Sequence, residues 1–166
     1  MHAQMPVQGH RQQAIRPGEA MHRLHTIRGA CHCGNLSYEL RTRMPLDAIR
    51  ARACDCSFCR MHAARNWSDP EGKAVVRIRD ARHLQRYRFG LRTADFLLCT
   101  VCGAYLGAVL SAGDQSWSTV NLRLSALDVG ETGASYGSED TDERIARRQH
   151  AWTPTAVIIE PDPPQA

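Results

Sequence analysis

The segment ACHCGNLSYEL, residues 30–40, joins a cysteine pair to a strand pattern. In its second half three apolar residues alternate with polar ones, which predicts a strand with one buried face. Cys31 and Cys33 stand directly before this strand, and Gly34 follows them as a residue that can turn the backbone sharply. Two thiols this close in a tight turn can bind one metal ion, so the segment predicts a metal-held turn that leads into a sheet.

Working outward, the chain continues as short alternating segments separated by glycine, proline or charged turns. Six more strands are predicted at residues 74–79, 84–89, 95–98, 104–110, 118–124 and 156–160. One short turn of helix is expected at 60–65, and residues 130–138 are typical of a loop. A better helix runs from Thr141 to about Gln149, because Asp140 can act as N-cap with Glu143 three residues on. This pattern predicts an all-β, or β-dominated, domain with one short C-terminal helix.

Composition supports one soluble domain at residues 25–160, with disordered ends at 1–24 and 161–166. The chain has 166 residues, of which 43% are hydrophobic and 23% charged. No apolar run approaches the roughly 18 residues of a membrane span, and no apolar signal segment opens the sequence. We therefore expect a cytoplasmic protein without membrane association.

The net charge gives little reason to expect a nucleic-acid partner. Lys and Arg outnumber Asp and Glu by 21 to 17, a formal charge of +4. Thiolates bound to metal would lower that net charge. Near Arg77, arginines alternate with apolar residues, which is typical of a solvated sheet face. The sequence also lacks the HExxH, P-loop and GxGxxG patterns.

Seven cysteines carry the strongest functional signal. At about 4% of the chain they are too few for a disulfide scaffold, and an odd number without a signal segment indicates reduced thiols. They fall into three groups with none left over: Cys31 and Cys33; Cys54, Cys56 and Cys59; Cys99 and Cys102. Such grouping favours metal binding, with zinc as the expected ion.

The simplest division gives two zinc ions per chain. Cys31, Cys33, Cys99 and Cys102 would form a closed, structural four-thiolate site that staples the sheet. The middle group would supply three ligands and leave a fourth position open, as in catalytic zinc sites. His62 is the residue most able to close that position, and a closed site would make the protein a binding module.

The three motifs CHCG (31–34), CDCSFC (54–59) and CTVCG (99–103) together resemble the glutathione-dependent formaldehyde-activating family, also called the centromere protein V type. The likeness spans about Gly29 to Trp152. It implies a β-tent of antiparallel sheets, a structural zinc on the outer four cysteines and a catalytic zinc on Cys54, Cys56 and Cys59. It also implies a carbon–sulfur lyase that joins glutathione to formaldehyde as S-hydroxymethylglutathione.

Several residues near the middle group are candidates for handling a small thiol and a small aldehyde. Arg60 and Arg65 could bind the carboxylates of a glutathione-like thiol, although arginines more often lie on a solvated surface. His62 could instead relay a proton to the adduct oxygen. Trp67 either walls the pocket or packs in the core. The alternative function is a non-catalytic, zinc-stabilised module that binds protein or nucleic acid.

Overall fold

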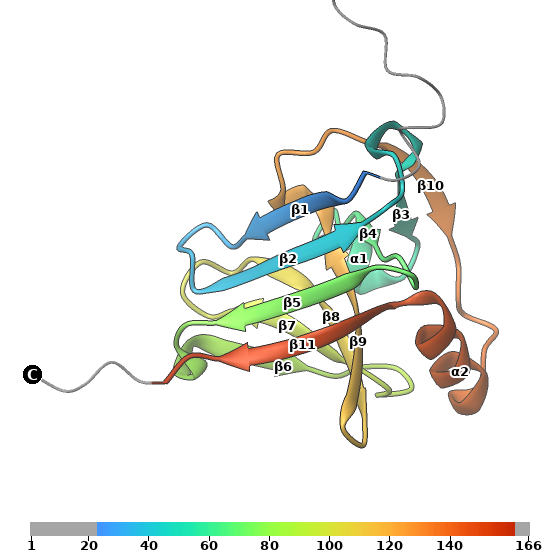
Figure 1. The fold of residues 1–166 in the computed structure, drawn as a ribbon. Coiled ribbons are helices and arrows are strands. Elements are labelled where there is room, and N and C mark those ends of the chain that lie inside the picture. Colours follow the sequence, from blue (N-terminus) through green and yellow to red (C-terminus); the bar gives the residue numbers. More distant parts are fainter. Residues whose placement is uncertain (1–22, 162–166) are drawn as a thin grey trace, which may run out of the picture.

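A computed structural model describes residues 23–161, so the segments expected to be disordered, 1–24 and 161–166, lie outside the described residues except at positions 23, 24 and 161. The described part is built mainly of strands (Figure 1). The strands are β1 (His25–Ala30), β2 (Leu36–Thr42), β3 (Arg50–Cys54), β4 (Asn66–Trp67), β5 (Lys73–Ile78), β6 (Leu84–Tyr87), β7 (Asp95–Cys99), β8 (Tyr105–Ala112), β9 (Gln115–Asn121), β10 (Gly130–Ala134) and β11 (Thr153–Ile159). The helices are α1 (Ser57–Met61) and α2 (Thr141–Ala151).

The strands form one open, folded sheet. Its main path runs β1-β2-β5-β11-β9-β4-β3-β10, while β8 branches from β9 and continues to β7 and β6. The strand β11 joins two layers, because Thr153 and Pro154 pair with β9 whereas the following residues pair with β5. In Figure 1 the layer of β1, β2, β5 and β11 lies in front of the layer that contains β7, β8 and β9.

The expectation of a β-dominated fold with a helix near the C-terminus is confirmed. Each of the seven predicted strands is present, with ends shifted by a few residues. The pairing is antiparallel except that β11 runs parallel to β5 and β10 runs parallel to β3 among the described strands. The loop expected at 130–138 is therefore partly wrong, since Gly130–Ala134 pairs with Arg50–Cys54 as an outer strand.

The core lies between the two layers and follows the predicted alternation. On β2 the residues Leu36, Tyr38 and Leu40 are buried, while those between them are only half-buried. They pack with Ile78 of β5 and with Leu97 of β7 in one cluster of buried apolar side chains. Trp67 belongs to the same cluster at 3% exposure, so it is a core residue and does not wall a pocket.

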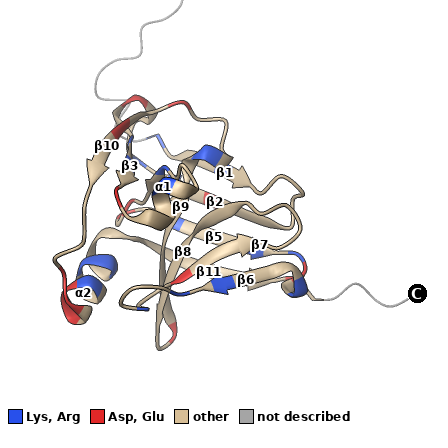
Figure 2. Ribbon diagram, turned by 180° about the vertical axis from the view of Figure 1, so that it is seen from behind, with Lys and Arg blue, Asp and Glu red and all other residues tan. Residues whose placement is uncertain are grey.

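The helix α2 is fixed at its beginning by the predicted cap. The Asp140 carboxylate accepts from the backbone N–H of Glu143 at 2.9 Å, and the Glu143 carboxylate accepts from the N–H of Asp140 at 3.0 Å. These two bonds satisfy N–H groups that the first helical turn leaves free. Figure 2 shows acidic residues at the start of α2 and basic residues farther along it.

No helix in residues 23–161 has the length and apolar character needed to span a bilayer.

Candidate metal centres

The turn between β1 and β2 and the turn between β7 and β8 bring four cysteines together. The Sγ atoms of Cys31 and Cys33 are 3.6 Å apart, and those of Cys33 and Cys99 are 3.4 Å apart. With Cys102 included, the four sulfur atoms all lie within 4.8 Å of one another. Sulfurs at about 2.3 Å from a tetrahedral zinc lie roughly 3.8 Å from each other, so this spacing fits one ion.

Two glycines allow these turns, as the sequence predicted. Gly34 has φ +77° and Gly103 has φ +73°, values that other residues rarely adopt. The N–H of Gly34 bonds to the carbonyl of Cys31 at 2.9 Å, and the N–H of Gly103 bonds to that of Cys99 at 2.9 Å. Each turn therefore closes tightly and points both of its thiols to the same side.

The second group comes from the end of β3 and the start of α1. Cys54, Cys56 and Cys59 place their Sγ atoms within 4.8 Å of one another. Cys56 is the N-cap of α1, and its sulfur accepts from the N–H of Cys59 at 3.4 Å. This short helical turn sets the spacing of the last two thiols, so the local sequence C-x-x-C produces the arrangement directly.

Two thiols of the second group, Cys54 and Cys59, differ in pKa. A hydrogen bond from Cys59 lowers the pKa of the Cys54 thiol to about 6. The same contact, together with burial, raises the pKa of Cys59. Cys54 accordingly becomes a thiolate before Cys59 does, and thiolate is the form that binds soft metal ions.

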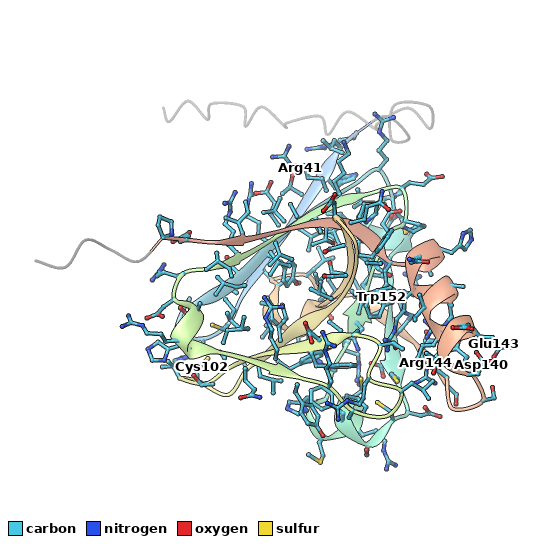
Figure 3. The ribbon with its side chains drawn as sticks, turned by 90° about the horizontal axis from the view of Figure 1, so that it is seen from below. Arg41, Cys102, Asp140, Glu143, Arg144 and Trp152 are labelled. Carbon is cyan, nitrogen blue, oxygen red and sulfur yellow. The ribbon has the colours of Figure 1, made fainter. Side chains whose placement is uncertain are left out.

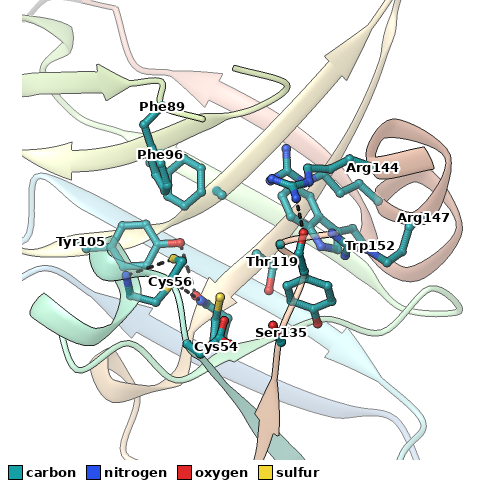
Figure 4. A pocket seen from close by; sticks show the side chains of 17 residues that line it. Cys54, Cys56, Phe89, Phe96, Tyr105, Thr119, Ser135, Arg144, Arg147 and Trp152 are labelled. Carbon is teal, nitrogen blue, oxygen red and sulfur yellow. Dashed lines mark hydrogen bonds between the residues drawn. The ribbon is translucent and has the colours of Figure 1, made fainter. Parts of the chain in front are cut away.

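A cavity of about 320 Å³ lies beside this group and is lined by all three of its thiols (Figure 4). The aromatic rings of Phe89, Phe96 and Tyr105 form one part of its wall. Arg144, Arg147, Arg148 and Trp152, from α2 and its C-terminal end, line another part. A set of thiols, an apolar wall and a row of guanidinium groups thus face one space.

The four-cysteine group does not line this cavity. Figure 3 places Cys102 at one end of the molecule, and Arg144 and Trp152 at the other. The two cysteine groups therefore have different surroundings, and only the three-cysteine group borders the cavity.

A chain of hydrogen bonds between residues of the cavity wall supports the three-cysteine group. Asn66 Nδ2 donates to Cys59 Sγ at 3.5 Å, and the Tyr105 hydroxyl donates to Asn66 Oδ1 at 3.3 Å. Both side chains are buried, and burial raises the pKa of Tyr105 well above its usual value. The phenol therefore stays protonated and keeps Asn66 oriented with its amide N–H toward the sulfur.

The structure does not bring His62 into the three-cysteine group. Its ring stacks on Phe58 with centroids 4.2 Å apart, and its Nδ1 lies 2.9 Å from the Phe58 carbonyl oxygen. Among the described residues, the ligand atoms of that group come from the cysteines alone. The geometry therefore does not support His62 as the fourth ligand or as a proton relay, because its half-buried ring packs against Phe58 and the edge of Tyr105.

Arg60 and Arg65 also lie elsewhere than the sequence suggested. Arg60 is exposed on α1 and does not line the cavity. Arg65 forms an ion pair with Glu131 beside a different hollow, near residues 122–129. Neither position offers a guanidinium to a ligand at the three thiols.

The guanidinium groups that do reach the cavity were missed in the sequence. Arg144, Arg147 and Arg148 are spaced three and four residues apart, so they share one face of a helix. That spacing is a signal the sequence contained. The sequence did not show what that face contacts, because this depends on how α2 packs against β8.

The segment Gly133-Ala134-Ser135-Tyr136-Gly137 matches the G-x-S-x-G pattern of serine hydrolases, and Ser135 lines the cavity. In those enzymes the serine sits in a strained turn between a strand and a helix. Here the positive φ angles outside glycine, among residues 23–161, belong to Ala63 and Arg92. No histidine lines the cavity, so the pattern does not indicate a serine nucleophile.

Known proteins give little that bears on this site. No model of a protein family matches the chain, and no curated protein matches it. A crystal structure of a Rhodobacter sphaeroides protein, solved as a structural genomics target, is similar to it at 29% sequence identity. That likeness covers 63% of this chain and 99% of the other, with a TM-score of 0.44.

Proposed function

We propose that the protein is a zinc-dependent enzyme that forms or cleaves adducts between a small thiol and a small aldehyde. The reaction type is that of a carbon–sulfur lyase, with glutathione, formaldehyde and S-hydroxymethylglutathione as the reference substrates and product. The observation that carries the proposal is the three-cysteine group, which borders a cavity and has no fourth ligand atom from the described residues.

The donor atoms of both groups fit zinc. Thiolate sulfur is a soft ligand, and four or three sulfurs within 4.8 Å of one another suit a tetrahedral ion. Cys31, Cys33, Cys99 and Cys102 would hold a structural ion, and Cys54, Cys56 and Cys59 would hold the second. An ion at the second group would supply a fourth position where a substrate thiol binds as thiolate.

The reaction balances without an oxidant or reductant. The thiol sulfur forms a bond to the carbonyl carbon, the carbonyl π bond breaks, and the proton lost by the thiol ends on the new hydroxyl. The reverse reaction breaks the same carbon–sulfur bond. The chain must therefore orient two small molecules and let one proton pass from the thiol to the carbonyl oxygen.

The cavity walls suit that task. Phe89, Phe96 and Tyr105 exclude water from one side, which favours the neutral carbonyl over its hydrate. Asn66 fixes the position of Cys59 through its 3.5 Å contact with the sulfur. The guanidinium groups of α2 offer positive charge to any carboxylate that the thiol or aldehyde carries.

The test is exchange between glutathione and its formaldehyde adduct, followed by two-dimensional exchange NMR. We expect zinc-loaded protein to raise the exchange rate above the spontaneous rate, and Cys56→Ser to remove that increase. Met61→Ala is the matched control on the same helix, because Met61 is 81% exposed and lies outside the cavity. Exchange at the spontaneous rate with a fully zinc-loaded protein would contradict the proposed reaction on these substrates.

A further inference from the structure

Arg148 is a buried cation without an acidic partner. It is 8% exposed, and the ion pairs formed among the described residues do not include it. Its Nη1 donates to Thr93 Oγ1, and its guanidinium lies 4.7 Å from the centre of the Trp152 ring. Its Nε is buried and has no hydrogen-bond partner. A buried donor of this kind is costly unless something at the site accepts from it.

The neighbouring arginines add positive charge to the same wall. Arg144 and Arg147 share the carboxylate of Glu139, at 3.1 Å from Arg144 Nε and 2.9 Å from Arg147 Nη2. One carboxylate therefore pairs with two guanidinium groups. Arg148, which does not pair with Glu139, adds a third positive charge. All three arginines line the cavity beside the thiols.

A fourth arginine lies close behind the cavity. Arg52 is two residues before Cys54, and its Nη2 donates to the hydroxyls of Ser68 at 2.7 Å and Thr119 at 3.0 Å. These partners are neutral, and Thr119 itself lines the cavity. Positive charge is thus in excess on the α2 side of the pocket, where it attracts anions, whereas Asp55 and the three thiols line the opposite side.

Burial lowers the pKa of Arg148 to about 10, which still leaves it charged at neutral pH. The charges of Arg147 and Arg144 on the same helix also lower this pKa, whereas Tyr105 and Glu139 act in the opposite direction. Its charge is therefore present, and repelled by its neighbours, in the working range of most enzymes.

We propose that Arg148, supported by Arg144 and Arg147, forms an anion subsite that binds the carboxylate of a small ligand in this cavity. The ligand's thiol or aldehyde group then faces Cys54, Cys56 and Cys59, and this part of the inference rests on the proposed function. A volume of about 320 Å³ is at the small end for ligand pockets, so the structure favours compact ligands. Mercaptoacetate carries the carboxylate on the thiol, and glyoxylate carries it on the aldehyde.

Binding is measured by isothermal titration calorimetry on zinc-loaded full-length protein. Mercaptoacetate is compared with its methyl ester, and glyoxylate with glycolaldehyde, so each pair differs chiefly in the carboxylate. We expect the carboxylate member of at least one pair to bind about tenfold more tightly, as a charge-assisted hydrogen bond predicts. Esterification makes a thiol more acidic, which favours the ester at the metal, whereas a free carboxylate can itself bind zinc, so the arginine variants decide which group holds the carboxylate.

The variants assign the effect to Arg148. Arg148→Gln is expected to reduce the preference for the carboxylate to less than about threefold, while Arg148→Lys retains part of it. Arg77→Gln is the matched control, because Arg77 is exposed on β5 and lies outside the cavity, and it should retain the whole preference. If Arg148→Gln does not fold by circular dichroism, Arg147→Gln takes its place and is expected to reduce the preference by about threefold.

The outcomes separate the two proposals. A preference in the mercaptoacetate pair alone places the carboxylate on the thiol, and one in the glyoxylate pair alone places it on the aldehyde. Equal affinity within both pairs, or no binding of any of the four compounds, would overturn the anion subsite. A preference unchanged in both the Arg148 and Arg147 variants would overturn its assignment to α2. Carboxylate-selective binding without exchange catalysis would leave the subsite standing and remove the proposed reaction.

Discussion

The Sγ atoms of Cys33 and Cys99 lie 3.4 Å apart, although 66 positions separate the two residues in the sequence. Cys33 is in the turn that precedes β2, and Cys99 is the last residue of β7. An ion shared by these thiols would tie the beginning of the front layer to the layer behind it. Because the tie closes a long loop of the chain, losing it should affect the whole fold.

Cys99→Ser is therefore expected to lower the free energy of unfolding by more than about 4 kcal/mol, as loss of a structural metal does. Cys56→Ser should bind one ion fewer per chain and keep its fold, since its group clips a single turn. Metal content by mass spectrometry and thermal melts by circular dichroism distinguish the two. Equal loss of structure in both variants would contradict the division into a structural and an open site.

Asp140→Ala removes the side-chain half of the cap at the start of α2. We expect a loss of about 1 kcal/mol in the free energy of unfolding, because the N–H of Glu143 loses its acceptor. Asp142→Ala is the control, since Asp142 is exposed on the same turn and does not cap it. The two are compared by urea denaturation, and equal effects would argue against the capping box.

Gly29→Ala tests the packing of β1 on β2. Gly29 lies opposite Tyr38, and a Cβ at that position would come within 2.4 Å of the tyrosine ring. The ring is buried and its hydroxyl donates to the carbonyl of Asn121 at 3.2 Å, so it has little room to move. We expect the substitution to lower the free energy of unfolding by about 1–3 kcal/mol, the usual effect of overpacking.

Gly133→Ala is the matched control for that substitution, because a Cβ there would meet nothing within 4 Å. It should change the melting temperature little. A melting temperature for Gly29→Ala equal to that of Gly133→Ala would show that Tyr38 shifts without cost.

The stability of the α2 region should depend on acid pH through Glu139. Hydrogen bonds from Arg147 and Arg144 lower the pKa of this carboxyl below its usual value. A carboxyl with a lowered pKa stabilises the fold above its unfolded pKa, and this contribution disappears as pH falls through its folded pKa. Glu139→Gln should thus be less stable than the unmodified protein at pH 7, with the difference shrinking below about pH 4.

Chemical denaturation of both proteins between pH 3 and pH 7 measures this difference. Asp114→Asn serves as the control, since Asp114 is exposed in the turn between β8 and β9. A stability difference that is constant with pH would mean that the carboxylate charge of Glu139 does not contribute.

Much of the fold could be predicted because its signals are local. The alternation of Leu36, Tyr38 and Leu40 is a property of seven consecutive residues of β2, and it needs no knowledge of the partner strand. β10 was missed for the opposite reason. Its sequence Gly-Glu-Thr-Gly-Ala has no buried face, and pairing with β3 alone makes it a strand.

The sequence by itself determined the two cysteine groups, most of the strands and the cap of α2. The strands, the cap and each short cysteine motif depend on residues a few positions apart, whose geometry the backbone sets. The union of Cys31 and Cys33 with Cys99 and Cys102 was predicted instead from the four ligands that a closed zinc site needs. Only the tertiary structure decided which side chains face the three thiols. It placed Arg148 there and kept Arg65 and His62 away, although both are near Cys59 in the sequence. Strand pairing and helix packing bring residues nearly a hundred positions apart into one cavity, and short-range periodicity does not encode that register.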